Sequence, residues 1–138
     1  MTELHPNLQL IQTFFEAYGA NDLTAIARVL SPDIEWVIPG QHPLSGVKRG
    51  VAEVLDYFKQ LNVFSFQAKP MVMGMNDDYV IDCHLNWSNR ENGENIELMS
   101  CLLWQFKDGR IWKVYNFPQD QHLIDAFFIK AVSETLPS

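Results

Sequence analysis

The chain has 138 residues, a length typical of a single domain, and 47% of them are hydrophobic, which is enough for a buried core. Its formal net charge of −7 argues against a nucleic-acid groove, because phosphate binding requires clustered lysine and arginine. From the length of the chain we expect one domain over residues 1–138. The N-terminus lacks a signal-peptide pattern and no apolar stretch approaches membrane-spanning length, so we expect the protein in the cytoplasm, with no membrane partner.

The first half of the chain predicts three helices and one strand. Apolar residues recur at helical spacing from Leu8 to Tyr18, and the glycine that follows interrupts them. Pro32 ends the next helical pattern, because the residue before a proline is disfavoured in a helix. The segment PGQHPLSGVKRG has three glycines and two prolines, which predicts a loop. The expected elements are helices over 7–20, 23–30 and 51–61 and a strand over 34–38.

The second half predicts an antiparallel sheet followed by a helix. Alternating apolar residues indicate strands, which turns at Asp77-Asp78 and Asp108-Gly109 separate. After Pro118 the apolar residues return to helical spacing. The expected elements are a strand over 64–74, a hairpin over 79–106, a strand over 111–117 and a helix over 121–136. This order indicates an α+β fold, with one curved antiparallel sheet and helices packed on its concave face.

The register of the hairpin decides which side chains face the core. Asn92-Gly93 is a strong signal for a two-residue turn, because both positions of a type I′ turn require a positive φ. With these residues at the tip, Tyr79 pairs with Phe106, and every second residue along both strands shares their face. That face is almost wholly apolar, so we expect it to line the core. It includes Cys83, Leu85, Trp87, Ser100, Leu102 and Trp104.

The opposite face of the hairpin is mixed in character. Asp82, His84 and Asn86 would lie there, directed toward water or a partner. Cys83 and Cys101 fall on opposite faces in this register, so we expect no disulfide between them. A one-residue bulge would place both on one face and reopen that question.

The order of the elements and three segments resemble the nuclear transport factor 2-like superfamily, and within it the SnoaL-like and ketosteroid-isomerase-like branch. The segments are FFEAYGANDLTAIARVLSPDIEWVIPG, HPLSGVKRGVAEVLDYFKQL, and FKDGRIWKVYNFP followed by LIDAFF. The resemblance implies a cone-shaped, cystatin-like α+β barrel with a deep apolar pocket between the concave sheet and the first and third helices. It also implies a homodimer through the outer sheet face.

Ketosteroid isomerases need an aspartate base and an oxyanion hole formed by a tyrosine and a protonated aspartate. Alignment with that resemblance uses the turn before the second helix, Pro39 and the Asp108-Gly109 turn. The family tyrosine then falls on Phe14, the base on Ile38 and the second aspartate on Leu102. None of these three side chains can exchange a proton or donate to an oxyanion, so we expect no ketosteroid isomerase activity.

SnoaL-like cyclases, to which the chain is similar, use an acidic residue near the end of the last strand to remove a carbon-bound proton. That position holds Gln119 here, and a one-residue shift at Pro118 would make Asp120 the base. The alternative is that Asp120 caps the last helix. His42 is the second candidate base, because histidine titrates near neutral pH and its loop would lie at the pocket mouth. Its alternative is an ordinary loop residue.

Strand alternation and the resemblance together predict a pocket with an apolar wall and a few polar groups, among which Tyr18, Tyr57 and Asn116 would position a substrate. The alternative is that the aromatic rings fill the barrel. No histidine pair has a metal-ligand spacing and no Cys-x-x-Cys occurs, so we expect no metal and no cofactor. The expected ligand contacts are Phe14, Tyr18, Trp36, Ile38, Tyr57, Trp87, Ser100, Leu102, Trp104 and Asn116.

Two functions remain open from the sequence. The first is an isomerase or cyclase that moves a proton on a small hydrophobic carbonyl compound. The second is a non-catalytic module that binds a small hydrophobic molecule or acts through its dimer face.

Overall fold

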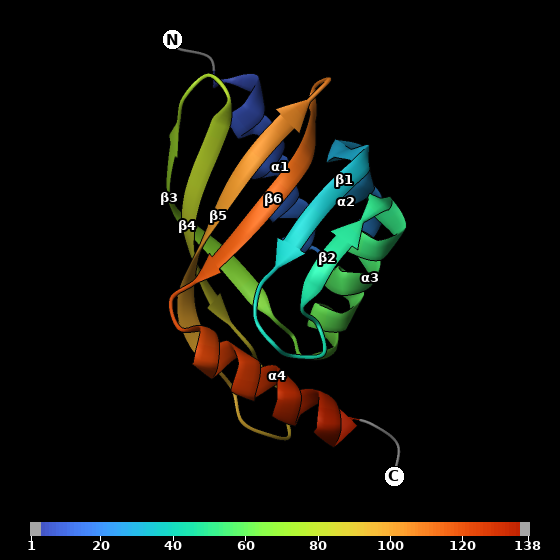
Figure 1. The fold of residues 1–138 in the computed structure, drawn as a ribbon, viewed down its shortest axis with the longest axis vertical. Helices are drawn as coiled ribbons and strands as arrows, with labels where there is room; N and C mark the ends of the chain where they lie inside the picture. Colours follow the sequence, from blue (N-terminus) through green and yellow to red (C-terminus); the bar gives the residue numbers. More distant parts are fainter. Residues whose placement is uncertain (1–3, 136–138) are drawn as a thin grey trace.

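The computed structural model describes residues 4–135, which form a six-stranded sheet and four helices (Figure 1). The helices are α1 (Pro6–Gly19), α2 (Leu23–Val29), α3 (Gly50–Val63) and α4 (Gln121–Thr135). The strands are β1 (Leu30–Ile38), β2 (Gly46–Arg49), β3 (Gln67–Met75), β4 (Tyr79–Trp87), β5 (Glu97–Lys107) and β6 (Arg110–Pro118).

Most of these bounds lie within a few residues of the expected ones. The segment predicted as a loop after β1 contains the short edge strand β2, and β1 begins at Leu30 rather than at residue 34. Residue 136, the last of the predicted final helix, lies outside the described residues. None of the helices among residues 4–135 is both long enough and apolar enough to cross a membrane.

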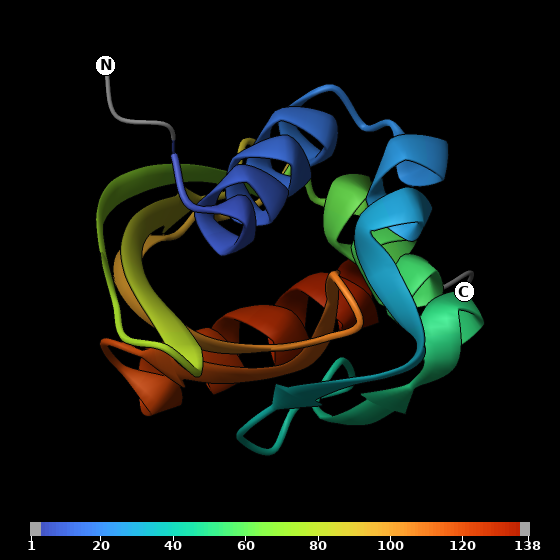
Figure 2. The same ribbon diagram turned by 90° about the horizontal axis from the view of Figure 1, so that it is seen from above.

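The strand order is β2-β1-β6-β5-β4-β3, and every neighbouring pair is antiparallel except β1 and β6. The sheet curls but does not close, because β2 and β3 remain its two edges. Figure 2 shows the curl, with α1 lying across the open side of the curved sheet. In Figure 1, α4 lies across one end of the sheet. The fold is therefore the expected α+β class, with a curled sheet in place of a closed barrel.

An aromatic cluster joins α1 and α3 to the sheet. The Phe14 ring lies 5.4 Å from the rings of both Trp36 and Trp104, and 5.5 Å from the Phe58 ring, measured between centroids. All four side chains are buried. Edge-to-face and tilted ring pairs at these distances each contribute about 0.5–1.5 kcal/mol beyond their burial. The cluster fixes the two helices that form one wall of the interior.

The register of the β4–β5 hairpin differs by one residue from the prediction. Residues 88–96 form a longer loop instead of a two-residue turn at Asn92-Gly93. The loop closes where the Ser88 N–H donates to the Ile96 carbonyl at 3.0 Å. The Asn95 side chain holds the loop from inside, accepting from the Ser88 hydroxyl at 2.9 Å. An asparagine that bonds nearby backbone and side chains in this way supports a loop without the tight turn.

The shifted register exchanges the two faces of β4, because successive side chains point to opposite sides of a sheet. Asp82 pairs with Leu102, and His84 pairs with Ser100. The expectation that Asp82, His84 and Asn86 face outward is therefore wrong. All three are buried on the concave side. The residues of β4 that lie on the outer face instead are Tyr79, Ile81, Cys83, Leu85 and Trp87.

Candidate functional site

A partly open cavity lies between the concave sheet face and helices α1, α3 and α4. The volume of this cavity is about 80 Å³. A buried water needs about 10–15 Å³, so the aromatic side chains leave space for several waters or a small ligand. The wall includes eight of the ten predicted ligand contacts, and their contact with a ligand stays a prediction. They are Phe14, Tyr18, Trp36, Ile38, Tyr57, Ser100, Leu102 and Asn116.

The remaining two predicted contacts, Trp87 and Trp104, do not line the cavity. Trp87 lies on the outer face of β4 because of the one-residue shift in register, so the inward placement predicted for it is wrong. Trp104 is wholly buried on the concave side, packed against Phe14 and Trp36. Its indole Nε1 donates to Asp82 Oδ1 at 2.5 Å. Trp104 therefore contacts residues at the wall without facing the cavity itself.

A buried histidine–aspartate pair lies on β4 at the cavity wall. His84 Nδ1 lies 2.8 Å from Asp82 Oδ2. Asp82 is 1% exposed and His84 is 5% exposed, and His84 lines the cavity. The two side chains share a face because they are two residues apart on a strand. Trp104 and His84 each bond one oxygen of the Asp82 carboxylate, so this buried acidic group has a partner for both oxygens.

The Asp82 contact fixes the tautomer of His84. A carboxylate oxygen accepts hydrogen bonds, so His84 Nδ1 carries the hydrogen and donates it. Nε2 is then the acceptor of the neutral ring. Among residues 4–135, no side chain or backbone group forms a hydrogen bond with His84 Nε2. An oriented imidazole with an unbonded acceptor nitrogen at a cavity wall can take a proton from a bound molecule.

Further polar groups lie in the same wall. Asn86 Nδ2 donates to the Ser100 hydroxyl at 2.7 Å across the β4–β5 pair. Two enclosed polar atoms of wall residues, Trp36 Nε1 and Asn116 Oδ1, have no hydrogen-bond partner among the described residues. An unbonded buried polar atom costs about 1–3 kcal/mol, so a ligand group that reached either atom would recover part of that energy.

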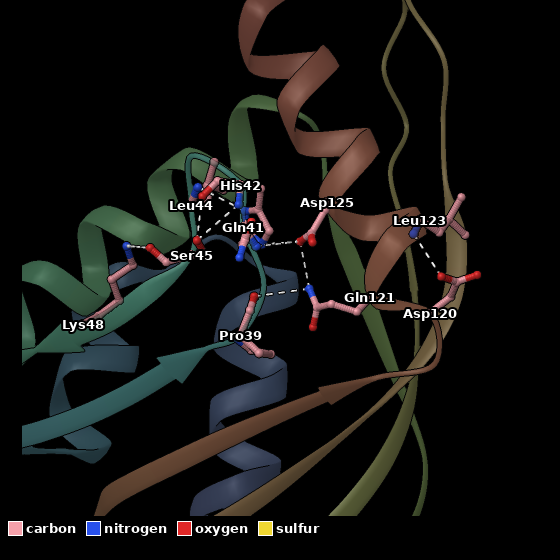
Figure 3. A network of polar contacts seen from close by, with 10 residues as sticks. All are labelled: Pro39, Gln41, His42, Leu44, Ser45, Lys48, Asp120, Gln121, Leu123 and Asp125. Carbon is pink, nitrogen blue, oxygen red and sulfur yellow. Dashed lines mark hydrogen bonds and ion pairs between the residues drawn. The ribbon is translucent and has the colours of Figure 1, made fainter.

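His42 lies in the loop between β1 and β2 and also lines the cavity. Its Nδ1 accepts the Leu44 N–H at 3.1 Å, so the hydrogen of the neutral ring is on Nε2. Nε2 lies 4.0 Å from Asp125 Oδ1, beyond hydrogen-bond length. Figure 3 shows this network, in which Gln121 of α4 connects Asp125 to the Pro39 carbonyl. His42 is therefore held as a donor, whereas His84 is held as an acceptor.

The environment of His42 predicts a pH dependence of stability. Burial lowers the pKa of His42, and the nearby Lys48 lowers it further, while Asp125 opposes both effects. The unfolded chain then binds a proton at a higher pH than the folded chain does. The resulting stability is complete above the unfolded value of about 6.5 and is lost as the pH falls toward the folded value.

Urea unfolding at pH 7.5 and pH 5.5 should therefore show a loss of stability at the lower pH that is smaller in His42→Asn. Asparagine can still accept the Leu44 N–H, but it does not titrate. The matched control is His122→Asn, an exposed histidine of α4, which should keep the wild-type difference. Equal pH differences in wild type and His42→Asn would contradict the assignment.

Asp120, the other candidate base, lies at the start of α4. Its Oδ1 accepts the Leu123 N–H at 3.0 Å, and its side chain is exposed. This contact is a helix N-cap, the alternative role considered for it. Asp120 is not among the residues that line the cavity, although its neighbour Gln121 is.

The two tyrosines of the wall remain protonated at neutral pH. Burial raises the pKa of Tyr18, with a smaller contribution from Tyr57, and burial also raises the pKa of Tyr57. The Tyr18 hydroxyl donates to the Phe66 carbonyl at 2.6 Å, so its hydrogen is already engaged. These hydroxyls can position a ligand, but they are poor bases.

Sequence patterns miss Asp82, His84 and Asn86 as site residues, because the two-residue turn signal assigns them to the outer face. The available signal was in the loop, where Asn95 and Ser88 can hold a longer connection. No group of three or more histidine, cysteine or acidic side chains within residues 4–135 is arranged to hold a metal ion.

Known proteins share this sequence pattern and fold. The family model of the SnoaL-like domain matches residues 11–114. An uncharacterized protein of Mycobacterium tuberculosis is 25% identical over 126 residues, covering 88% of this chain and 95% of the relative. A solved NTF2-like protein of unknown function from Burkholderia pseudomallei has a TM-score of 0.81 at 21% identity, covering 91% of this chain and 98% of that one. TerC, co-crystallized with polyporic acid, has a TM-score of 0.79 at 19% identity, covering 91% and 99%.

Proposed function

Because the chain belongs to the SnoaL-like domain family, within the nuclear transport factor 2-like superfamily, we propose that its cavity transfers a proton on a small hydrophobic carbonyl compound. The reaction class is that of an isomerase or a cyclase. The observation that carries the proposal is the buried Asp82–His84 pair, whose unbonded nitrogen belongs to a residue of an otherwise largely apolar wall. TerC, which shares the fold, was co-crystallized with polyporic acid, and this supports a search among small organic compounds.

The pair provides the base for the reaction. His84 Nε2 takes a proton from the carbon next to the carbonyl group, and the electron pair of that C–H bond moves onto the carbonyl oxygen to give an enolate. The Asp82 carboxylate stabilises the imidazolium that forms, as the acidic member of other histidine–carboxylate pairs does. Because the pair is buried, this attraction is screened less than it would be in water.

The developing negative charge on oxygen requires a hydrogen-bond donor. His42 offers one through Nε2, since its Nδ1 is occupied by Leu44. The Trp36 indole offers a second, because its N–H has no partner among the described residues. Return of the proton from His84 to another carbon completes an isomerisation. In a cyclisation the enolate carbon attacks a second carbonyl of the same molecule, and the new alkoxide oxygen takes the proton from His84.

Proton transfer is tested with the wild-type protein in D₂O and a panel of small aromatic and aliphatic ketones. NMR should show deuterium entering the position next to the carbonyl faster than in buffer. The second candidate function, a non-catalytic binding module, is favoured by the apolar residues Phe14, Ile38 and Leu102 at the isomerase positions. It predicts that compounds bind, as seen by changes in tryptophan fluorescence, without accelerated exchange.

A homodimer through the outer sheet face is part of the proposed function. The shifted register gives this face Ile81, Leu85 and Trp87 from β4 beside Met99 from β5. Phe117 of β6 lies on the same face and is 54% exposed. Ile81 and Met99 are also exposed, while Leu85 and Trp87 are half-buried. Exposed apolar side chains that share one face are typical of protein interfaces. A second copy of the chain, presenting the same face, would cover it.

We expect Ile81→Lys and Phe117→Glu each to convert the dimer into a monomer, because each places a charge in the apolar contact. Size-exclusion chromatography with light scattering measures the mass directly. The matched control is Val63→Lys, at an exposed position on α3 away from this face, which should remain dimeric. A monomeric wild type, or two variants that remain dimers, would contradict the proposed interface.

A further inference from the structure

The two cysteines of the chain lie directly opposite each other on the outer face of the sheet. Cys83 of β4 is the cross-strand partner of Cys101 of β5, and both are free thiols with partial exposure. The two-residue turn would have separated them onto opposite faces, so the shifted register reopens the question of a bond between them. The chain has only these two cysteines, so a disulfide within one chain has a single pairing.

The hydrogen-bond pattern shows how close the pair is. Opposite residues in an antiparallel ladder alternate between hydrogen-bonded and non-hydrogen-bonded pairs. The Ser88 N–H donates to the Ile96 carbonyl, so that pair is hydrogen-bonded. The register runs without a break from there along β4, which makes Cys83 and Cys101 a non-hydrogen-bonded pair. Such pairs have Cα atoms about 4.5 Å apart, within the range of about 4.4–6.8 Å that a disulfide requires.

The surroundings allow a small molecule to reach the thiols. Across the outer face, Cys83 is paired with Val72 of β3, and Cys101 is paired with Phe117 of β6. Val72 is 63% exposed and Phe117 is 54% exposed, so in the single chain the half-buried cysteine pair has exposed neighbours on both sides. In the proposed dimer a second copy covers this face, so exchange takes place while the two copies are apart. No group of three or more metal-ligand side chains is present among the described residues, so a metal site does not account for the pair.

We propose that Cys83 and Cys101 form a reversible cross-strand disulfide by exchange with a low-molecular-weight disulfide such as oxidised glutathione. One cysteine thiolate attacks a sulfur of the small disulfide, forms a mixed disulfide and releases one small thiol. The second cysteine then attacks the protein-side sulfur, closes the Cys83–Cys101 bond and releases the second small thiol. The cysteines lose two protons and two electrons, and the small disulfide gains both.

The bond would connect β4 to β5 on the opposite side of the sheet from the proposed Asp82–His84 base. Cys83 lies between Asp82 and His84 in the sequence, and these two side chains point to the other side of the sheet. The disulfide would also remove two thiols from the centre of the apolar outer face. Burial raises the pKa of the Cys101 thiol, and contact with Cys83 raises it further, so exchange should accelerate as the pH rises above neutrality.

The test incubates the folded wild-type chain with oxidised glutathione and then blocks the remaining thiols with an alkylating reagent. Intact-mass measurement should show a chain that has lost two hydrogen atoms and carries neither alkyl group nor glutathione. Peptide mapping should recover the Cys83–Cys101 crosslink, and dithiothreitol should restore two alkylatable thiols. Circular dichroism before and after oxidation confirms that the fold is retained.

The matched variants Cys83→Ser and Cys101→Ser should each stop at the mixed disulfide, because the second attacking thiol is missing. Three results would overturn the proposal. They are two free thiols in the wild type at equilibrium, a wild-type mixed disulfide that never closes, and a bond between two chains on a non-reducing gel. The wild-type measurement does not depend on how well the variants fold.

Discussion

Replacing His84 by glutamine is expected to lower the rate of proton transfer by roughly 10²–10⁴-fold, the usual contribution of a general base. Glutamine is close in size and can still bond Asp82, but it cannot accept a proton from carbon. Asp82→Asn should cause a loss of the same order, because an amide can donate to His84 Nδ1 and favour the wrong tautomer. Deuterium incorporation into a ketone that the wild type exchanges measures both effects.

The control for this prediction is Asp120→Ala. The exposed Asp120 side chain caps α4, so its removal should cost about 0.5–2 kcal/mol of stability and leave the exchange rate unchanged. The two assignments of the base are thus separated by one pair of variants. An unchanged rate in His84→Gln together with a large loss in Asp120→Ala would identify Asp120 as the base and reject the Asp82–His84 pair.

The fold could be predicted from the sequence because its signals are repeated along each element. Apolar spacing defines α1 and α3, and alternation defines the four strands from β3 to β6, so one misplaced residue changes little. The edge strand β2 was missed because Gly46–Arg49 is short and carries the composition of a loop. It becomes a strand by pairing with β1 after the chain reverses direction. Local sequence patterns do not indicate such a pairing.

The candidate site could be predicted only in part, because its polar residues depend on a single register. The residues of α1, β1 and β5 in the cavity wall follow from periodicity and lie where expected. His84 does not, because a difference of one residue in the β4–β5 loop moves it from one side of the sheet to the other. The strand itself offers no warning, since Ile81 and Leu85 make the other face of β4 the more apolar one. The general preference for apolar residues inside therefore favoured the wrong register.

The orientation of β4 also determines the character of the outer sheet face. A strand that turns its polar residues inward and its apolar residues outward departs from the usual pattern of a half-buried sheet. The inward polar residues are satisfied by specific partners, as Asp82 is by Trp104. Among the outward residues of β4, Ile81 is 49% exposed and the others are half-buried. Both features agree with the proposed functions, which are proton transfer by the inward Asp82–His84 pair and self-association through the outward apolar face.

Trp104→Ala is expected to lower the free energy of unfolding by about 3–5 kcal/mol, the usual cost of emptying a large aromatic site in a core. Trp104 is wholly buried and packs against Phe14, Phe15 and Trp36. Trp104→Phe keeps most of the ring contacts but removes the indole N–H, so it should cost about 1–3 kcal/mol through the unbonded Asp82 oxygen. Urea unfolding at pH 7, followed by circular dichroism, measures both.

The matched control is Trp112→Phe. Trp112 is half-buried, with the amines of Lys107 and Lys113 at 5.2 and 4.5 Å from its ring centroid. Phenylalanine retains an aromatic face for these cations, so the change should cost less than about 1 kcal/mol. Equal losses in the two Trp→Phe variants would show that the hydrogen bond to Asp82 contributes nothing measurable.

A double-mutant cycle separates the packing contribution of Trp104 from the contribution of its hydrogen bond to Asp82. If Trp104 acts through Asp82, then Trp104→Phe should destabilise the Asp82→Asn protein less than it destabilises the wild type, by a coupling energy of about 0.5–3 kcal/mol. A purely structural role for Trp104 predicts additive losses instead. Trp104 also packs against Phe14 and Trp36 of the cavity wall, and phenylalanine keeps most of these ring contacts. The main effect of Trp104→Phe on the reaction should therefore come from the lost hydrogen bond to Asp82. Trp104→Phe should then slow proton transfer in the wild-type background and have little further effect once Asp82 has been replaced.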